Sequence, residues 1–135
     1  MEDKIYVISC NQELASMGMD RRRMVVEGLQ EISISLDWSK ATLVPVVAEE
    51  KKQFQVGETN IISIRPINIP AYAMVIQSFY GSNGMGHLSC VGYTEYKSFD
   101  DERVANKAMF QSRIKAAVLK GDLLGQIMLI PGQKV

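Results

Sequence analysis

The stretch that decides the fold is Glu31-Ile-Ser-Ile-Ser-Leu-Asp-Trp38. In it, Ile32, Ile34 and Leu36 alternate with two serines and an aspartate. Because successive side chains of a strand point to opposite faces, this period of two predicts a strand that is buried on one face only. We therefore expect the chain to build its core from β-sheets.

Short β-rich runs lie on both sides of this stretch. They cover residues 4–10, 42–48, 59–65, 73–80, 87–96, 114–119 and 123–130. Pro45 lacks an amide hydrogen and predicts an edge strand or a bulge within 42–48. Turn signals at spacings of roughly 8–12 residues favour an all-β architecture over strands that alternate with long helices. We predict a mainly β fold, a small antiparallel barrel or sandwich, with a β-clip-like arrangement as one alternative.

Two segments between the strands have helical signals, which predict a short helix or a loop over 11–18 and a helix over 100–110. Residues 11–18 have a polar start and end on a glycine. Residues 100–110 follow Ser98-x-x-Asp101, the arrangement of a capping box, and they continue with apolar residues at helical spacing. If 11–30 and 100–119 were both full helices, the fold would instead be a ferredoxin-like α+β fold, which is the second alternative.

Three connections can be predicted from proline and glycine. Pro66 and Pro70 each bias the preceding residue towards extended backbone and indicate a turn or crossover between strands. The runs 73–80 and 87–96 read as a hairpin with a glycine-rich tip at 81–86. Lys120-Gly-Asp122 predicts a tight turn in which Gly121 adopts a positive φ.

Length and composition restrict the class of protein. A chain of 135 residues predicts a single domain that spans residues 1–135. Hydrophobic residues make up 47% and charged residues 22%, which excludes disordered and fibrous proteins. Fifteen basic residues balance fifteen acidic ones, so the chain lacks the positive field that binding to nucleic acid normally uses. We expect no nucleic-acid partner.

The sequence shows no recognisable targeting signal and few cysteines, and both features indicate a cytoplasmic protein. The N-terminus does not read as a secretory signal, and no apolar stretch approaches the ~20 residues of a membrane span. Cys10 and Cys90 lie far apart, with no CxxC motif. They are too few for a disulfide framework and are typical of buried, reduced thiols. We expect a cytoplasmic protein with no membrane partner.

The most site-like stretch is Tyr80-Gly-Ser-Asn-Gly-Met-Gly-His-Leu-Ser-Cys90. Its glycines free the backbone to point several amide hydrogens at one anion, and its polar side chains can add donors. The candidate ligand-binding residues are Ser82, Asn83, Gly84, Gly86 and His87. The same residue types also suit a plain hairpin tip, which is the alternative.

His87 is the only histidine and the candidate catalytic residue, because an imidazole suits general acid or base chemistry near neutral pH. An orienting hydrogen bond is the alternative role. The spacing His87-x-x-Cys90 could supply two zinc ligands, but positions three apart along a strand face opposite sides. We therefore expect no metal and no cofactor.

Arg21, Arg22 and Arg23 form the sharpest charge run of the chain. Guanidinium groups bind phosphate or carboxylate through two parallel hydrogen bonds. A solvated turn or salt bridges between subunits are the alternatives. We expect His87 and at least one of these arginines to share an anion site, either within one subunit or across an interface.

Four motifs in order carry a family resemblance. They are Val56-Gly-Glu-x-x-x-Ile-x-Ile, Ile69-Pro-Ala-Tyr-Ala-Met-Val75, Gly86-His-x-x-x-Val-Gly92 and Lys120-Gly-Asp-Leu-Leu-Gly125. In these motifs the chain resembles an archaeal-type family known only as domain of unknown function number twenty-two, over about residues 38–130. The resemblance implies a small β-rich domain without an assigned activity, and it directs attention to Gly86-His87 and the turn at 120–122.

A fainter likeness is to β-clip proteins such as the trimeric dUTPases. It rests on Ile-Pro and on a Lys-Gly-Asp turn. The chain lacks the Gly-x-x-Asp-x-x-Tyr motif that carries the catalytic aspartate of those enzymes. The likeness therefore concerns the fold rather than the activity.

The expected function follows from these features. Uniformly apolar runs, such as 42–48 and 123–130, leave more apolar surface than a small β domain can cover alone, so we expect a homo-oligomer. The leading interpretation is a homo-oligomeric β domain that binds a small anionic ligand near the 80–90 loop. The alternatives are an enzyme that uses His87 as acid or base, and an interaction or scaffold module with no ligand.

Overall fold

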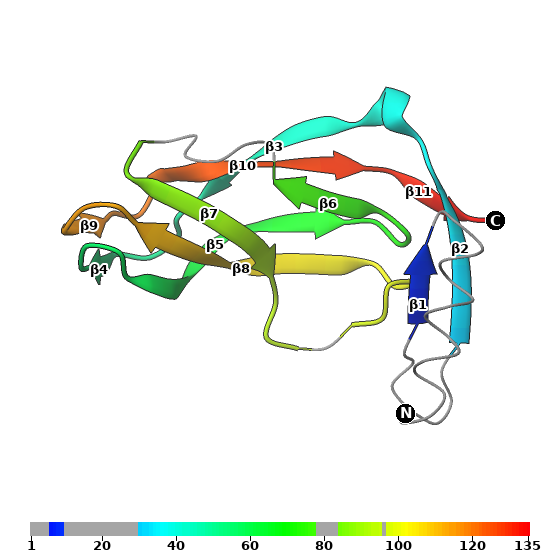
Figure 1. Ribbon diagram of the computed structural model, residues 1–135, viewed down its shortest axis with the longest axis horizontal. Helices are drawn as coiled ribbons and strands as arrows, with labels where there is room; N and C mark the ends of the chain where they lie inside the picture. The colour runs from blue at the N-terminus through cyan, green and yellow to red at the C-terminus, as the bar shows by residue number, and fades with distance from the viewer. Residues whose placement is uncertain (1–5, 10–29, 78–83, 96) are drawn as a thin grey trace.

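The computed structural model describes residues 6–9, 30–77, 84–95 and 97–135 and shows a mainly β fold (Figure 1). Its strands are β1 Tyr6–Ser9, β2 Gln30–Leu36, β3 Thr42–Val47, β4 Lys52–Phe54, β5 Thr59–Ile69, β6 Met74–Gln77, β7 Gly86–Gly92, β8 Arg103–Ser112, β9 Ala116–Val118, β10 Leu123–Ile130 and β11 Gly132–Lys134. A single 3-10 turn, η1 Trp38–Lys40, is the only helical element over these ranges. Over the same ranges, no helix is long and apolar enough to cross a membrane.

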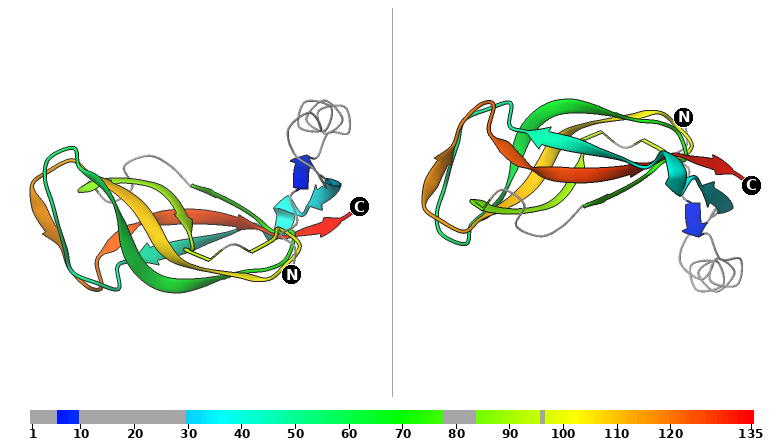
Figure 2. Two further views of the ribbon diagram at one scale, coloured as in Figure 1. Left: turned by 90° about the horizontal axis from the view of Figure 1, so that it is seen from below. Right: turned by 90° about the horizontal axis from the view of Figure 1, so that it is seen from above.

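Two antiparallel sheets of three strands form a sandwich. One sheet has the order β3-β10-β6 and the other β5-β8-β7, and they lie as two layers along the long axis (Figure 2). The core between them combines buried residues from both layers, among them Val46 and Ile127 from the first and Ile62 and Phe110 from the second. A single antiparallel bridge between Ala48, directly after β3, and Ile64 of β5 links the two sheets, and no further strand pairing within the described residues closes them into a barrel. The sandwich is therefore the form that the predicted antiparallel fold takes.

A two-stranded ribbon and a third three-stranded sheet lie at the two ends of the sandwich (Figure 1). The ribbon of β4 and β9 lies at one end, where it buries Phe54 and Val118, and the Phe54 ring meets Phe110 edge-on with centroids 5.7 Å apart. At the end that holds the C-terminus, β2 pairs with β1 in parallel and with β11 antiparallel.

Several sequence predictions are confirmed. Ile32 and Ile34 of β2 are buried, as the alternation of 31–38 requires. Pro45 lies on β3, an edge strand of its sheet, so its missing amide hydrogen leaves no gap in a central ladder. Gly121 has a φ of 95° in the turn before β10, a conformation that glycine adopts without steric strain. The Asp122 carboxylate accepts a hydrogen bond from the Leu119 amide across this turn, at 2.8 Å.

The helix predicted over 100–110 is wrong, because this segment is a turn followed by β8. Ser98 and Asp101 form a backbone hydrogen bond of 3.0 Å in that turn rather than a capping box. Ala105 and Ala108 are both buried although they lie three residues apart, since the pairing register with β5 shifts at this point. A strand irregularity thus mimics helical spacing. The ferredoxin-like alternative fails with it, while the short helix or loop predicted over 11–18 lies outside the described residues.

The turn predicted between Pro66 and Pro70 is also wrong. β5 runs through Pro66 and continues to Ile69. Its register with β8 shifts between Ser63 and Ile67, and a residue that cannot donate to the ladder is tolerated where the pairing is interrupted.

The hairpin predicted from 73–80 and 87–96 does not form. β6 pairs with β10, whereas β7 pairs with β8, so the chain changes sheets between these two strands. Local sequence indicates where a strand ends, but pairing with distant strands decides its neighbour. His87 consequently lies opposite Gln111 of β8 rather than opposite a residue of β6.

Candidate functional site

The glycine-rich stretch is described from Gly84 onward, while Ser82 and Asn83 lie outside the described residues. Gly84 has a φ of 77°, and a Cβ built on it would have open space around it. Gly86 is buried, and a Cβ there would collide with the Gln111 carbonyl oxygen and the Phe110 ring. Gly86 therefore permits close packing of β7 on β8, whereas Gly84 provides a left-handed turn on the surface.

His87 is half-buried at the edge where the two sheets meet. Its Nδ1 lies 3.4 Å from Nε2 of Gln77 on β6, and this amide nitrogen donates to Nδ1 in the tautomer that leaves Nδ1 unprotonated. This contact links β7 to β6 across the sandwich edge. The predicted partners Arg21, Arg22 and Arg23 lie outside the described residues, so the shared anion site stays a prediction.

The prediction that His87 and Cys90 face opposite sides of their strand is wrong, because β7 contains an irregularity between Leu88 and Cys90. His87 and Cys90 lie opposite Gln111 and Met109, which are two residues apart on β8 and so share a face. Cys90 is exposed rather than buried as expected, and Cys10 is outside the described residues. Within the described residues, no group of three or more His, Cys, Asp or Glu side chains could hold a metal ion.

The two sheets differ in the charge of their strands. β3, β6 and β10 contain no Asp, Glu, Lys, Arg or His. On this sheet the register places Leu43, Met128 and Ile76 in one row across the three strands, with Leu43 57% and Ile76 42% exposed. The next row holds Pro45 and Gln126, which are also uncharged.

The β5-β8-β7 sheet carries a similar row between polar neighbours. Met109 lies between Ile61 and Cys90, with Ile61 50% and Met109 38% exposed. One adjacent row contains Lys107 opposite Ser63, and the other contains Gln111 opposite His87. Only the β3-β10-β6 sheet therefore presents an outer face whose strands are free of charge.

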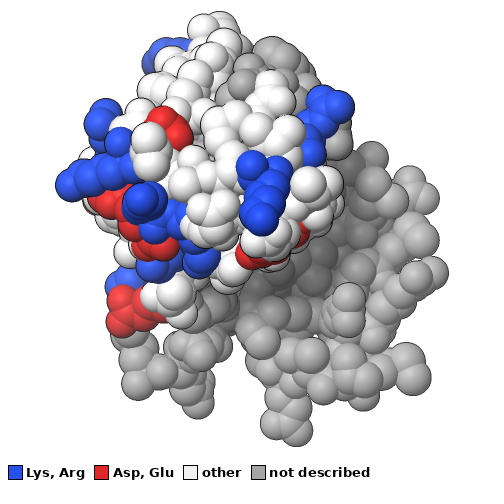
Figure 3. Space-filling model, turned by 90° about the vertical axis from the view of Figure 1, so that its left-hand side faces the viewer, with Lys and Arg blue, Asp and Glu red and all other residues white. Residues whose placement is uncertain are grey.

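A charged network begins on the second sheet. Lys107 Nζ donates to the Ser63 hydroxyl at 2.8 Å. A hydrogen bond from the Ser63 hydroxyl lowers the pKa of Glu50 below its ordinary value of 4.5, and nearby lysines lower it further. Glu49 lies close to two cations, Lys120 at 3.3 Å and Arg65 at 3.7 Å. Seen from the β4–β9 end, Lys and Arg side chains are interspersed with Asp and Glu along one side (Figure 3).

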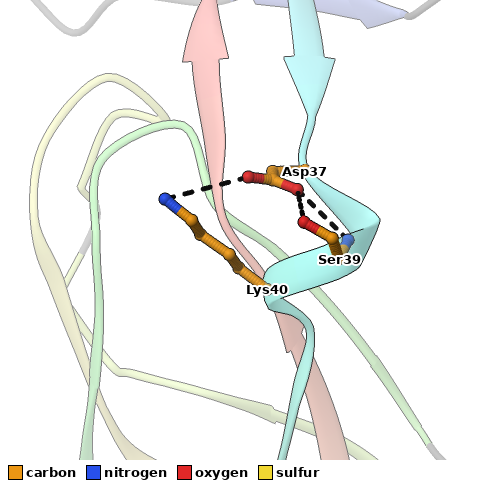
Figure 4. A network of polar contacts seen from close by, with 3 residues as sticks. All are labelled: Asp37, Ser39 and Lys40. Carbon is orange, nitrogen blue, oxygen red and sulfur yellow. Dashed lines mark hydrogen bonds and ion pairs between the residues drawn. The ribbon is translucent and has the colours of Figure 1, made fainter.

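A second polar network surrounds η1. The Asp37 carboxylate accepts hydrogen bonds from the Ser39 hydroxyl and the Ser39 amide and lies 4.0 Å from Lys40 Nζ (Figure 4). The Ser39 hydroxyl is the main cause of a lowered Asp37 pKa. All three side chains are exposed, so this network stabilises a local turn and makes no enclosed site.

A hollow of about 620 Å³ lies at the ends of β7 and β8 that are remote from His87. Its surface is polar and apolar in about equal parts, and it contains two cations, two acids and several hydrogen-bonding side chains. Its lining residues are Asn68, Ile69, Pro70, Tyr93, Thr94, Glu95, Lys97, Glu102, Arg103, Val104 and Asn106.

Arg103 is the most constrained side chain of this hollow. Its Nη2 donates to the carbonyl oxygens of Pro70 and Ala73 at 3.2 and 3.0 Å, and its guanidinium lies 5.0 Å from the centre of the Phe99 ring. The same ring meets Tyr72 edge-on, and Tyr72 has a φ of 64°, which is rare for a residue with a bulky side chain. Arg103 thus fixes the turn between β5 and β6.

This hollow was not predicted from the sequence, because residues 100–110 form β8 instead of the predicted helix. As a helix, Arg103 and Asn106 would share one face by themselves. As β8, they approach the end of β5 and the segment after β7, from which the other polar side chains come. The signal that could have revealed the site is the run of polar residues from Thr94 to Glu102 between two strands.

Comparisons with known proteins agree with the resemblance in the motifs. The family described as Domain of unknown function DUF22 matches residues 17–115, a range that begins before the expected residue 38 and ends before the Lys120–Gly125 motif. An uncharacterized protein of Methanocaldococcus jannaschii is 33% identical over 96 residues, which cover 71% of this chain and 74% of that protein. No solved structure is significantly similar to the chain. The chain therefore belongs to the DUF22 family of domains of unknown function.

Proposed function

We propose that this chain is a homo-oligomeric domain that binds a small anionic ligand beside residues 84–87. The observation that carries the proposal is the uncharged outer face of the β3-β10-β6 sheet, with the apolar row Leu43, Met128 and Ile76 at its centre. Contiguous exposed apolar surface is costly in water and is characteristic of interaction surfaces.

The occupant of this face is a second copy of the chain. A charged partner surface would lose its hydration against strands that offer no opposite charge, which is unfavourable. The same face of another copy carries no charge either, and a two-fold axis brings identical rows together. On the other sheet, Lys107 and His87 flank the apolar row and would have to be desolvated.

Mass measurement tests the self-association. We expect light scattering coupled to gel filtration to give at least twice the 15.1 kDa of the chain at concentrations of about 10–500 μM. A mass of one chain over this whole range would contradict the proposal.

The ligand part of the proposal concerns Gly84 and His87. Gly84 is in a left-handed conformation with open space beside it, and His87 is half-buried on the adjoining strand. Backbone amides of such a turn and an imidazole are donors that suit a phosphate or a carboxylate.

Thermal denaturation with inorganic phosphate tests this site. We expect phosphate to raise the melting temperature of the wild type by mass action and to raise it less for His87→Ala. Ser89→Ala, an exposed position on the same strand, is the matched control. Equal phosphate responses of all three proteins would exclude His87 from an anion site.

A further inference from the structure

We propose that the 620 Å³ hollow beside Arg103 binds a small organic anion, a hydroxylated carboxylate or phosphate, through Arg103 and Lys97. The site goes beyond the proposed function, because it lies at the opposite ends of β7 and β8 from His87. Its volume falls within the range of roughly 300–1,000 Å³ that is typical of small-molecule sites.

The Arg103 guanidinium has only neutral hydrogen-bond partners among the described residues. Its two hydrogen-bond acceptors, the carbonyl oxygens of Pro70 and Ala73, are neutral. Its Nε is buried without a hydrogen-bond partner, and no carboxylate of the described residues forms an ion pair with it. A partly desolvated cation that forms no ion pair with the described residues is unfavourable, and a bound anion offsets that cost.

The Arg103 side chain and the segment that carries Lys97 are held in place before a ligand binds. Phe99 stacks on the guanidinium, and the two carbonyls hold its Nη2, so Arg103 has little freedom to lose when a ligand binds. The Tyr93 hydroxyl donates to the Lys97 carbonyl oxygen at 3.2 Å, which ties the segment that carries Lys97 to the end of β7. Both cations are therefore attached to fixed parts of the wall.

The remaining lining residues restrict the class of ligand. Glu95 and Glu102 repel a ligand that is negatively charged throughout, while Asn68, Asn106 and Thr94 offer hydrogen bonds to neutral groups. A single carboxylate or phosphate on a hydroxylated carbon chain satisfies both conditions. Its anionic group would face Arg103 and Lys97, and its hydroxyl groups would face the amides and the glutamates.

The test is a titration of the ¹⁵N-labelled full chain, followed by NMR, with gluconate, glucose 6-phosphate and glucose as probes. We expect gluconate or glucose 6-phosphate, but not glucose, to shift the amide signals of Tyr93, Arg103 and Asn106. Comparison of the two anions shows whether a carboxylate or a phosphate is preferred. No shift at these amides with either anion up to about 50 mM, or an equal shift with glucose, would overturn the inference.

The variants avoid Arg103, since its removal also releases the turn between β5 and β6. Lys97 and Lys115 are both exposed lysines, but only Lys97 lines the hollow. Lys97→Ala is expected to weaken binding about fivefold, in line with the loss of one ionic contact, and Lys115→Ala to leave it unchanged. Equal binding by the two variants would contradict the inference.

Failure of this inference can be distinguished from failure of the proposed anion site. Shifts confined to Gly84 and His87 would support the proposed function and reject the hollow. Shifts at the hollow that persist in His87→Ala would support the hollow as an independent site.

Discussion

The two sheets of the sandwich share one core, and each has an apolar row across its outer face with a methionine on the central strand. Met128 lies at the centre of the row on β3-β10-β6, and Met109 holds the same place on β5-β8-β7. The rows differ in their surroundings, because charged and polar side chains flank Met109, whereas the strands around Met128 carry no charge.

This difference shows that the shared core constrains the inner faces of both sheets but not their outer faces. Inward residues of both sheets are apolar, since both sheets bury them against the same core. Outward residues are not constrained by that core, so one sheet can keep an uncharged face for self-association while the other supplies polar side chains for a ligand. Three predictions test the assignment of inward, turn and charged positions on which this account rests, in order of decreasing effect.

The largest effect on the free energy of unfolding is expected when a buried side chain of the shared core is truncated. Phe110 is fully buried against Phe54, so Phe110→Ala should lower the free energy of unfolding by about 3–5 kcal/mol. Its neighbour Met109 points outward, and Met109→Ala should lower the free energy by less than about 1 kcal/mol. Urea denaturation of both variants measures the difference. Similar losses would mean that the inward and outward sides of β8 are wrongly assigned.

A smaller effect is expected at the turn before β10. Gly121→Val places a β-branched side chain at a φ of 95° and should lower the free energy of unfolding by about 1 kcal/mol or more. Gly92, at the end of β7, has open space around it and no positive φ, so Gly92→Val serves as the control. Thermal denaturation that leaves the Gly121 variant as stable as the control would show that backbone strain at this turn is negligible.

The smallest effect concerns acid stability at Glu50, which lies between β3 and β4 and accepts a hydrogen bond from Ser63 of β5. The pKa of Glu50 is lowered, mainly by the Ser63 hydroxyl, so its contribution is present above pH 4.5 and is lost as the pH falls below that value. Glu50→Gln should therefore lose less stability than the wild type between about pH 5.5 and 3. Solvent screening keeps this difference small. Parallel curves of melting temperature against pH would argue against a role for the Ser63 hydrogen bond.

Much of the sandwich can be predicted from the sequence, because its period of two is a local signal. Ile32 and Ile34 alternate with serine in a strand that buries one face, and the range 123–130 coincides with β10. The turn at Gly121 follows from the same local chemistry, since a positive φ is a property of the single residue.

Strand partners and irregularities could not be predicted in this way. The spacing of Ala105 and Ala108 resembles a helix only because the register of β8 and β5 shifts beside them. Pairing between distant strands also separates β6 from β7. Both features are properties of the assembled sheet rather than of a short window of sequence.

The candidate site was predicted only in part. His87 is evident because it is the only histidine, and its neighbouring glycines are evident because they cluster in one short run. The hollow at Arg103 depends on the ends of three strands that meet in space, with Asn68 and Arg103 brought together from distant positions. The polar run from Thr94 to Glu102 is a local signal, but it does not show which strand ends the run meets in space.

We propose that the uncharged sheet, β3-β10-β6, associates with a second copy of the chain, while the charged sheet, β5-β8-β7, does not. The most direct test compares the mass in solution of Met128→Glu and Met109→Glu, which place the same charge at equivalent positions of the two sheets. Leu43→Glu, at an exposed edge position of the uncharged row, provides a second variant with little risk to the core. Circular dichroism confirms that each variant is folded.

We predict that folded Met128→Glu and Leu43→Glu have the mass of one chain, because a buried, unpaired carboxylate at the interface is strongly unfavourable. Met109→Glu is predicted to keep the mass of the wild-type oligomer. If the variants of the uncharged row keep the oligomeric mass while folded, or if Met109→Glu alone dissociates the oligomer, the assignment of the two faces is contradicted.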